Sequence, residues 1–89
     1  MAWQVEFDPR AEKELASLGT SAQRKIISYL RERISTDEDP RRFGKALQGG
    51  LQGLWRYRVG DYRLVCQLRD NAFVVLVVRV GHRRDVYLI

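Results

Sequence analysis

The chain has 89 residues, of which 45% are hydrophobic and 30% charged, and its formal net charge is +5. This length and mixture predict a single folded domain, residues 1–89, and exclude a disordered chain. The sequence has no apolar run of about 18 residues, no signal-peptide pattern and only one cysteine, so we expect a cytoplasmic protein without a membrane partner or a disulfide.

The first predicted elements are a strand and a helix. Apolar residues at 3, 5 and 7 alternate with polar ones, which is typical of a strand with one buried face. Asp8 and Pro9 then predict a helix start, because an aspartate can accept hydrogen bonds from the free N–H groups and proline fits the first helical position. We expect this helix to run to about Leu18 and to be closed by Gly19.

A second helix and a loop follow. We expect Thr20 or Ser21 to cap the helix, whose apolar positions recur at the helical repeat as far as Ile34. The two helices then form a helical hairpin with a tight turn. Residues 35–53 contain an acidic run and four glycines, and they are expected to be loop-like.

The remainder of the chain predicts an antiparallel meander. Strands are expected over residues 54–59, 62–69 and 72–80, joined by short turns. The third strand is apolar on both faces and should be covered, and residues 85–89 are expected to add a short edge strand. The predicted fold class is therefore α+β, with the helices on one face of a three- to four-stranded meander and the other face free for function.

Positive charge is concentrated in the second half of the chain. Residues 1–40 carry six basic and eight acidic side chains, a net charge of −2, whereas residues 41–89 carry ten basic and three acidic ones, a net charge of +7. All ten basic residues except Lys45 are arginines, whose planar guanidinium donates two hydrogen bonds to a phosphate. This distribution favours a nucleic-acid partner over a face that only keeps the protein in solution.

Strand alternation brings some of these arginines together on the free face. Arg56 and Arg58 point the same way from one predicted strand, and Arg63 and Arg69 share a face of the next. Like charges at such short range repel, and a bound phosphate relieves the repulsion. The alternative is that the arginines pair with acids at the sheet edges, but this half of the chain has only three acids.

A second dense patch lies at residues 81–87. Tyr87 could stack on a base or transfer a proton, and Arg83 could hold a scissile phosphate. Simpler roles are also open: the tyrosine as a core residue, His82 as a surface group, and Asp85 as the ion-pair partner of the neighbouring arginines.

No metal or cofactor site is expected. The lone histidine, lone cysteine and scattered acids lack the spacing of a zinc or magnesium site or of a catalytic triad. RNA cleavage without a metal stays open, because the ribose supplies its own 2′-hydroxyl nucleophile. The protein would then orient the backbone, stabilise the crowded phosphate and move protons.

Three segments match the pattern of one protein family. They are Val-Glu-Phe-Asp-Pro-Arg-Ala at 5–11, Asp-Tyr-Arg-Leu-Val at 61–65 and Gly-His-Arg-Arg-Asp-Val-Tyr at 81–87. With them, the chain resembles the RelE family of toxins, in the RelE/ParE superfamily of type II toxin–antitoxin systems. The resemblance implies a RelE-like fold and ribosome-dependent cleavage of mRNA in the A site, which inhibits translation. It also implies a cognate antitoxin that neutralises the toxin and joins it in repressing their operon, so that operator DNA is bound only through the complex.

The resemblance also assigns site residues. The family's catalytic positions match Arg56, Arg58, Arg63, Arg83 and Tyr87. Further RNA-binding residues are expected at Arg69, Lys45, Arg41, His82 and Arg84. The chain departs from the family's best-studied pattern at two positions, because lysines there are replaced by Arg56 and Arg58.

The two replacements change the expected chemistry. Arginine keeps its proton, so Arg56 and Arg58 should stabilise charge and grip RNA, and the general base would be Tyr87, His82 or a ribosomal group. Two other functions remain open. One is ParE-like inhibition of DNA gyrase without RNA cleavage, and the other is a non-catalytic nucleic-acid-binding module.

Overall fold

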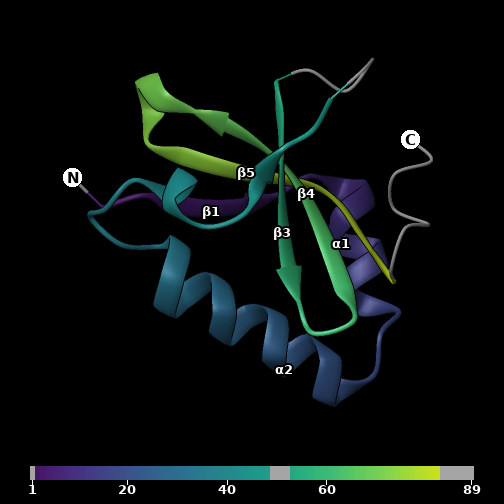
Figure 1. The fold of residues 1–89 in the computed structure, drawn as a ribbon. Coiled ribbons are helices and arrows are strands. Elements are labelled where there is room, and N and C mark those ends of the chain that lie inside the picture. Colours follow the sequence, from purple (N-terminus) through teal and green to yellow (C-terminus); the bar gives the residue numbers. More distant parts are fainter. Residues whose placement is uncertain (1, 49–52, 83–89) are drawn as a thin grey trace.

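The computed structural model of the chain describes residues 2–48 and 53–82 (Figure 1). Its main elements are β1 (Gln4–Phe7), α1 (Pro9–Ala16), α2 (Thr20–Tyr29), β2 (Lys45–Ala46), β3 (Leu54–Val59), β4 (Tyr62–Arg69) and β5 (Val74–His82). A π-helical turn, Leu30–Ile34, continues α2, and 3₁₀ turns lie at Pro40–Arg42 and Asp70–Ala72. This order confirms the predicted α+β class.

The strands form one mixed sheet in the order β1-β5-β4-β3-β2. Strands β3, β4 and β5 make the predicted antiparallel meander, and β2 adds to it antiparallel to β3. Strand β1 pairs parallel with β5, from Gln4 opposite Val74 to Phe7 opposite Val77. Strand β5 therefore lies inside the sheet, as its apolar run predicted.

The start of the first helix agrees with the prediction, whereas the turn between the two helices differs from it. The Ala11 N–H donates to Asp8 Oδ1 at 2.8 Å, which confirms the predicted cap. Helix α1 ends at Ala16, and Gly19 is the N-cap of α2 with an extended backbone, so the predictions that Gly19 closes α1 and that Thr20 or Ser21 caps α2 were wrong. The amide of Gln23 explains the difference, because it donates to carbonyls at the end of the first helix and replaces a glycine closure.

The loop predicted over 35–53 contains β2, which the sequence did not reveal. Two aromatic side chains of β3 hold this loop to the sheet: Trp55 Nε1 donates to the Phe43 carbonyl at 2.7 Å, and the Tyr57 hydroxyl donates to the Pro40 carbonyl at 2.9 Å. The loop therefore depends on the sheet for its position.

Gly44 allows β2 to approach β3. Its φ is +76°, a region that glycine enters readily, and a Cβ there would collide with the carbonyl oxygen of Arg56. This position places the next residue, Lys45, in register with Arg56.

The last described strand is shifted from its predicted bounds. A 3₁₀ turn occupies 70–72 and Phe73 has φ +52°, so β5 begins at Val74 and extends to His82. The edge strand predicted over 85–89 lies outside the described residues.

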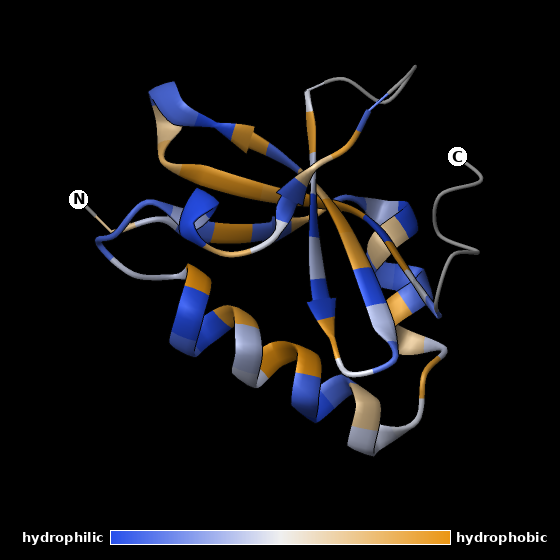
Figure 2. Cartoon of the chain, in the orientation of Figure 1, coloured by the Kyte–Doolittle hydropathy of each residue, from blue (hydrophilic) through white to orange (hydrophobic). Residues whose placement is uncertain are grey.

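A single hydrophobic core lies between the helices and one sheet face. Figure 1 shows α2 beside the β3–β4 hairpin and α1 beside β5, and Figure 2 shows the hydrophobic stretches of β4 and β5. The fully buried side chains of this core include Ala11, Ile26, Ile34, Tyr57, Leu64, Cys66, Val75 and Val77. The buried Cys66 agrees with its interpretation as a small core residue, and burial raises the pKa of its thiol. None of the described helices is long and apolar enough to cross a membrane.

Candidate nucleic-acid interface

Strand register gathers five cationic side chains on the sheet face opposite the helices. Tyr57, Leu64 and Cys66 point into the core, so the residues between them on β3 and β4 point the other way. In one row across four strands, the register aligns Lys45, Arg56, Val65 and Arg79. In the next row it aligns Arg58, Arg63 and Gly81. We call the five cations, Lys45, Arg56, Arg58, Arg63 and Arg79, the basic sheet face.

The spacing of a sheet sets the spacing of these charges. Neighbouring strands lie about 4.8 Å apart, and alternate residues of one strand about 6.7 Å apart, so the Cα atoms of the five span a patch of roughly 15 Å. Arg58 and Arg63 are directly opposite each other, an arrangement of like charges that destabilises a sheet. A phosphodiester bound between them would remove that repulsion.

The side chains differ in exposure and in partners. Lys45 and Arg58 are exposed, whereas Arg56, Arg63 and Arg79 are half-buried. Arg79 pairs with Glu14 of α1 at 3.0 Å. Within the described part of the chain, no carboxylate forms an ion pair with Lys45, Arg58 or Arg63. Lys45, Arg58 and Arg63 thus carry positive charge that no described carboxylate neutralises.

The sequence and the fold match known toxins. The family model for the ParE toxin of type II toxin–antitoxin systems matches residues 5–87. Toxin RelG of Mycobacterium tuberculosis is 31% identical over 87 residues, covering 98% of each chain, and the mRNA interferase toxin RelE of Escherichia coli is 34% identical over 91 residues, covering 98% of this chain and 92% of that one. The chain belongs to the RelE family of type II toxins.

Solved structures of RelE-family toxins have the same fold. The RelBE2 toxin–antitoxin complex of M. tuberculosis has a TM-score of 0.84 at 29% identity, covering 96% of this chain and 95% of that one. The isolated RelE toxin of E. coli has a TM-score of 0.73 at 28% identity, covering 97% and 92%. The likeness therefore extends over the whole β-sheet and both helices.

The structure brings together three of the five catalytic residues that the RelE resemblance assigns. Arg56 and Arg58 of β3 and Arg63 of β4 lie on the basic sheet face, as strand alternation predicted. The other two, Arg83 and Tyr87, lie outside the described residues, as does the predicted RNA-binding residue Arg84. Their catalytic and binding roles stay predictions.

The predicted RNA-binding residues lie at different places in the toxin. Lys45 extends the row that contains Arg56, and Arg69 is on the same face but about 20 Å along β4 from Arg63. The Arg69 Nε donates to the Gln67 side chain at 3.1 Å. The roles of Lys45 and Arg69 in RNA binding stay predictions.

Arg41 and His82 lie away from the basic sheet face. Arg41 makes two hydrogen bonds to Asp70, at 2.9 and 2.7 Å, which raise the pKa of Arg41 and hold the pKa of Asp70 below its usual range. His82 pairs in register with Tyr62 on the helix side of the sheet, with the two rings 5.3 Å apart. RNA contacts at these two residues likewise stay predictions.

Sequence reasoning missed Arg79. The available signal was a single charge in the otherwise apolar run 74–80. The chain bulges where β5 passes Val65 and Cys66, and this shift puts Arg79 on the basic sheet face, in one row with Arg56 and diagonal to Arg63.

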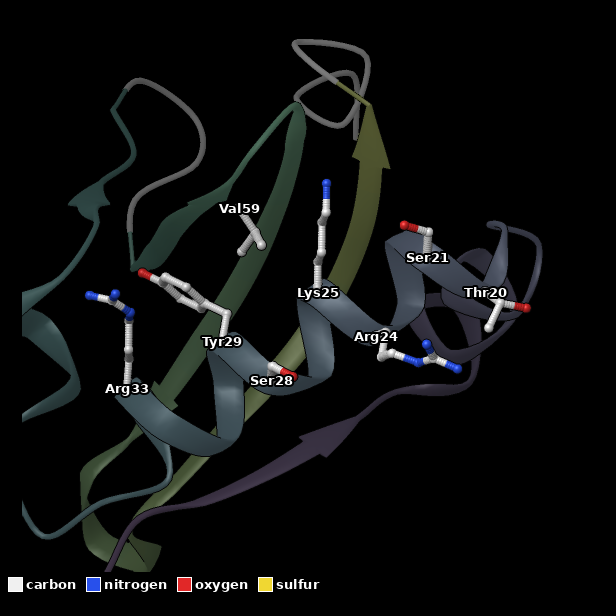
Figure 3. Close-up of a pocket in the computed structure, with 8 residues that line it drawn as sticks. All are labelled: Thr20, Ser21, Arg24, Lys25, Ser28, Tyr29, Arg33 and Val59. Atoms are coloured by element: carbon white, nitrogen blue, oxygen red, sulfur yellow. The ribbon is translucent and has the colours of Figure 1, made fainter.

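A second basic surface lies along α2 (Figure 3). Its groove, of about 750 Å³, is lined by Thr20, Ser21, Arg24, Lys25, Ser28, Tyr29, Arg33 and Val59. Figure 3 shows Tyr29 and Val59 facing each other, while Arg24 and Lys25 extend in different directions. Burial raises the pKa of Tyr29, with Arg33 opposing the shift. This groove contains none of the residues that match the RelE pattern, so the basic sheet face is the stronger candidate site.

Proposed function

We propose that this RelE-family toxin is an endoribonuclease that cuts mRNA on the ribosome without a metal ion. The main support is the basic sheet face, where Arg58 and Arg63 are directly opposite each other and neither forms an ion pair with a described carboxylate. Two guanidinium groups in this position can both donate hydrogen bonds to the oxygens of one phosphate. The name of the E. coli relative, an mRNA interferase, supports the same substrate.

The chemistry follows from the substrate. The ribose 2′-hydroxyl attacks the adjacent phosphorus, the bond to the 5′-oxygen breaks, and the products are a 2′,3′-cyclic phosphate and a 5′-hydroxyl. Arg56, Arg58 and Arg63 stabilise the negative charge that grows on the phosphate oxygens. Because arginine does not act as a base, the proton of the 2′-hydroxyl passes to Tyr87, His82 or a ribosomal group, and one of these groups returns a proton to the leaving 5′-oxygen. Arg83 is assigned to the scissile phosphate. The ribosome would supply the alignment of the mRNA backbone.

A cognate antitoxin is the proposed protein partner. The similar structures of M. tuberculosis and E. coli include toxin–antitoxin complexes. We propose that the antitoxin of this chain covers the basic sheet face or the RNA path to it, and that operator DNA is contacted only by their complex.

Primer extension on mRNA tests the proposed activity. The full chain is added to a translation extract, and cuts are expected in phase with codons. They should vanish with Arg83→Ala and fall strongly with Tyr87→Phe. Arg10→Ala is the matched control, because Arg10 is an exposed arginine of α1 and is not one of the five catalytic positions that the resemblance assigns. Uncut mRNA with a folded wild-type protein would refute the proposal.

Inhibition of DNA gyrase is a second candidate, because the matching family model is that of the ParE toxin. A supercoiling assay separates the two functions. Blocked supercoiling together with intact mRNA would favour gyrase, whereas cut mRNA with normal supercoiling would favour RNA cleavage. A non-catalytic binding module would show neither effect, and Arg56→Ala would then weaken RNA binding uniformly across sequences.

A further inference from the structure

Two buried arginine nitrogens on the basic sheet face lack hydrogen-bond partners. Among residues 2–48 and 53–82, Arg63 Nε and Arg79 Nη1 are the only buried side-chain nitrogen or oxygen atoms in this state. A buried donor without an acceptor loses its hydration on folding and gains nothing in return. Native proteins hold few such atoms, and each one calls for an explanation, of which a bound ion is one.

The two arginines are neighbours on the same face. Arg63 of β4 is opposite Gly81 of β5, and Arg79 is opposite Val65, the residue two places along β4 from Arg63. This is a diagonal cross-strand relation, with backbone positions about 7–8 Å apart. Long side chains at that separation can reach one phosphate together.

Glu14 of α1 fixes the orientation of Arg79. Its carboxylate accepts from Arg79 Nε at 3.0 and 3.2 Å and from the Val80 N–H at 2.8 Å. The Arg79 side chain is only 12% exposed and that of Glu14 24% exposed, so the contact is shielded from water. The carboxylate occupies the Nε side of the guanidinium and leaves Nη1 without an acceptor.

We propose that Arg63 and Arg79 form a phosphate-binding subsite on β4 and β5, with Glu14 as the positioning residue for Arg79. The ligand is a phosphate of an RNA backbone, an assignment that rests on the proposed function. Arg79 is not among the five catalytic positions that the family pattern assigns. The subsite adds a second phosphate contact beside Arg58, which would fix the direction of the RNA strand across the sheet.

Phosphate binding can be observed directly on the full wild-type chain. The Nε–H signals of Arg63 and Arg79 are followed by NMR while inorganic phosphate is added. Both signals should shift along one saturating curve, and the Nε–H signal of Arg10 should not. Equal shifts at all three arginines, or none at Arg63 and Arg79, would overturn the subsite. This measurement needs no variant, so it decides the matter even where Arg79→Ala fails to fold.

RNA binding then tests the source of the phosphate. Fluorescence anisotropy with a labelled single-stranded RNA should show about tenfold weaker binding by Arg79→Ala, the size expected for one charge-assisted hydrogen bond. The slope of log affinity against log salt should also fall by about 0.7. Arg10→Ala, which removes the same charge elsewhere, should change neither quantity. An unchanged affinity for RNA with intact phosphate binding would limit the subsite to free phosphate.

The variant Glu14→Gln tests whether Glu14 orients the Arg79 side chain or only neutralises its charge. If Glu14 positions Arg79, the amide variant binds phosphate more weakly even though a negative charge has been removed. Tighter binding would mean that Glu14 only neutralises Arg79, and it would contradict the positioning role.

The outcomes also separate this subsite from the proposed function. Phosphate binding at Arg63 and Arg79 by a protein that cuts no mRNA would refute the nuclease and keep the subsite. Normal cutting and RNA binding by Arg79→Ala would refute the assignment of the subsite to an RNA phosphate and keep the nuclease.

Discussion

Glu14 joins α1 to β5, and its removal should be costly. Strand β1 pairs with β5 only as far as Val77, and beyond that point the Glu14 carboxylate accepts from the Val80 N–H and from Arg79 Nε. Glu14→Ala leaves a guanidinium that is 12% exposed without its carboxylate, and it leaves one strand N–H without an acceptor.

The magnitude can be estimated from these contacts. Breaking a buried ion pair costs about 3–5 kcal/mol, and the lost N–H bond about 1 kcal/mol. Because the Glu14 side chain is 24% exposed, water recovers part of this cost, and we expect about 3 kcal/mol in total. A domain of this size is stable by only about 4–13 kcal/mol, so the Tm should fall by roughly 10–20 °C.

Urea unfolding of a double-mutant cycle measures this coupling. Glu14→Ala combined with Arg79→Ala should cost less than the sum of the single variants, by about 1–3 kcal/mol, because no unpaired charge remains. The control is Glu12→Ala, an exposed glutamate of the same helix, which should stay within about 0.5 kcal/mol of wild type. Equal midpoints for Glu14→Ala and Glu12→Ala, or a coupling of zero, would show that the Glu14 contacts do not stabilise the fold.

Three further predictions concern the loop and the turns around the site. Tyr57→Phe should lower the free energy of unfolding by about 1–2 kcal/mol, because it leaves the Pro40 carbonyl without its buried donor. Urea unfolding measures this loss with Tyr62→Phe as the control, and equal losses in the two variants would contradict a stabilising role of the Tyr57 hydrogen bond. Gly44→Ala should lower the free energy of unfolding by at least about 2 kcal/mol, because φ is +76° and a Cβ would collide with the Arg56 carbonyl. A crystal structure of an equally stable variant with β2 still paired to β3 would contradict this. Asp70→Asn should destabilise the protein at neutral pH and have no effect in acid, because Arg41 lowers the folded-state pKa of Asp70 and its stabilisation is lost as the pH falls through that pKa. Thermal unfolding from neutral to acidic pH measures this difference, and a constant difference would refute it.

Local patterns predicted most of the fold, and they failed where distant segments meet. Alternation and the Asp8-Pro9 pair predicted β1, the first helix and the meander. The parallel pairing of β1 with β5 and the short strand β2 depend on contacts between segments far apart in the sequence. The closure of α1 was missed because the Gln23 amide, from the next helix, takes the part that Gly19 was expected to play.

The difference between local patterns and long-range contacts also explains which residues of the basic sheet face could be predicted from the sequence. Arg56, Arg58 and Arg63 share a face because of alternation within two adjacent strands, a local property. Strict alternation from Val75 and Val77 would have sent Arg79 into the core. The bulge opposite Val65 and Cys66 reverses the alternation, so that Val80 is buried in its place and Arg79 joins the basic sheet face.

Strand β3 shows why the charged face and the core are built together. Tyr57 and Val59 are buried, while Arg56 and Arg58 alternate with them on the opposite face. A slip of one residue in the β3–β4 register would bury both arginines and expose Tyr57, so the core fixes the register. Tyr57 also holds the loop at Pro40 through its hydroxyl, and Gly44 then sets Lys45 beside Arg56. The position of each cation is thus determined by a buried neighbour, and the hydrophobic core holds the cations close together against their mutual repulsion.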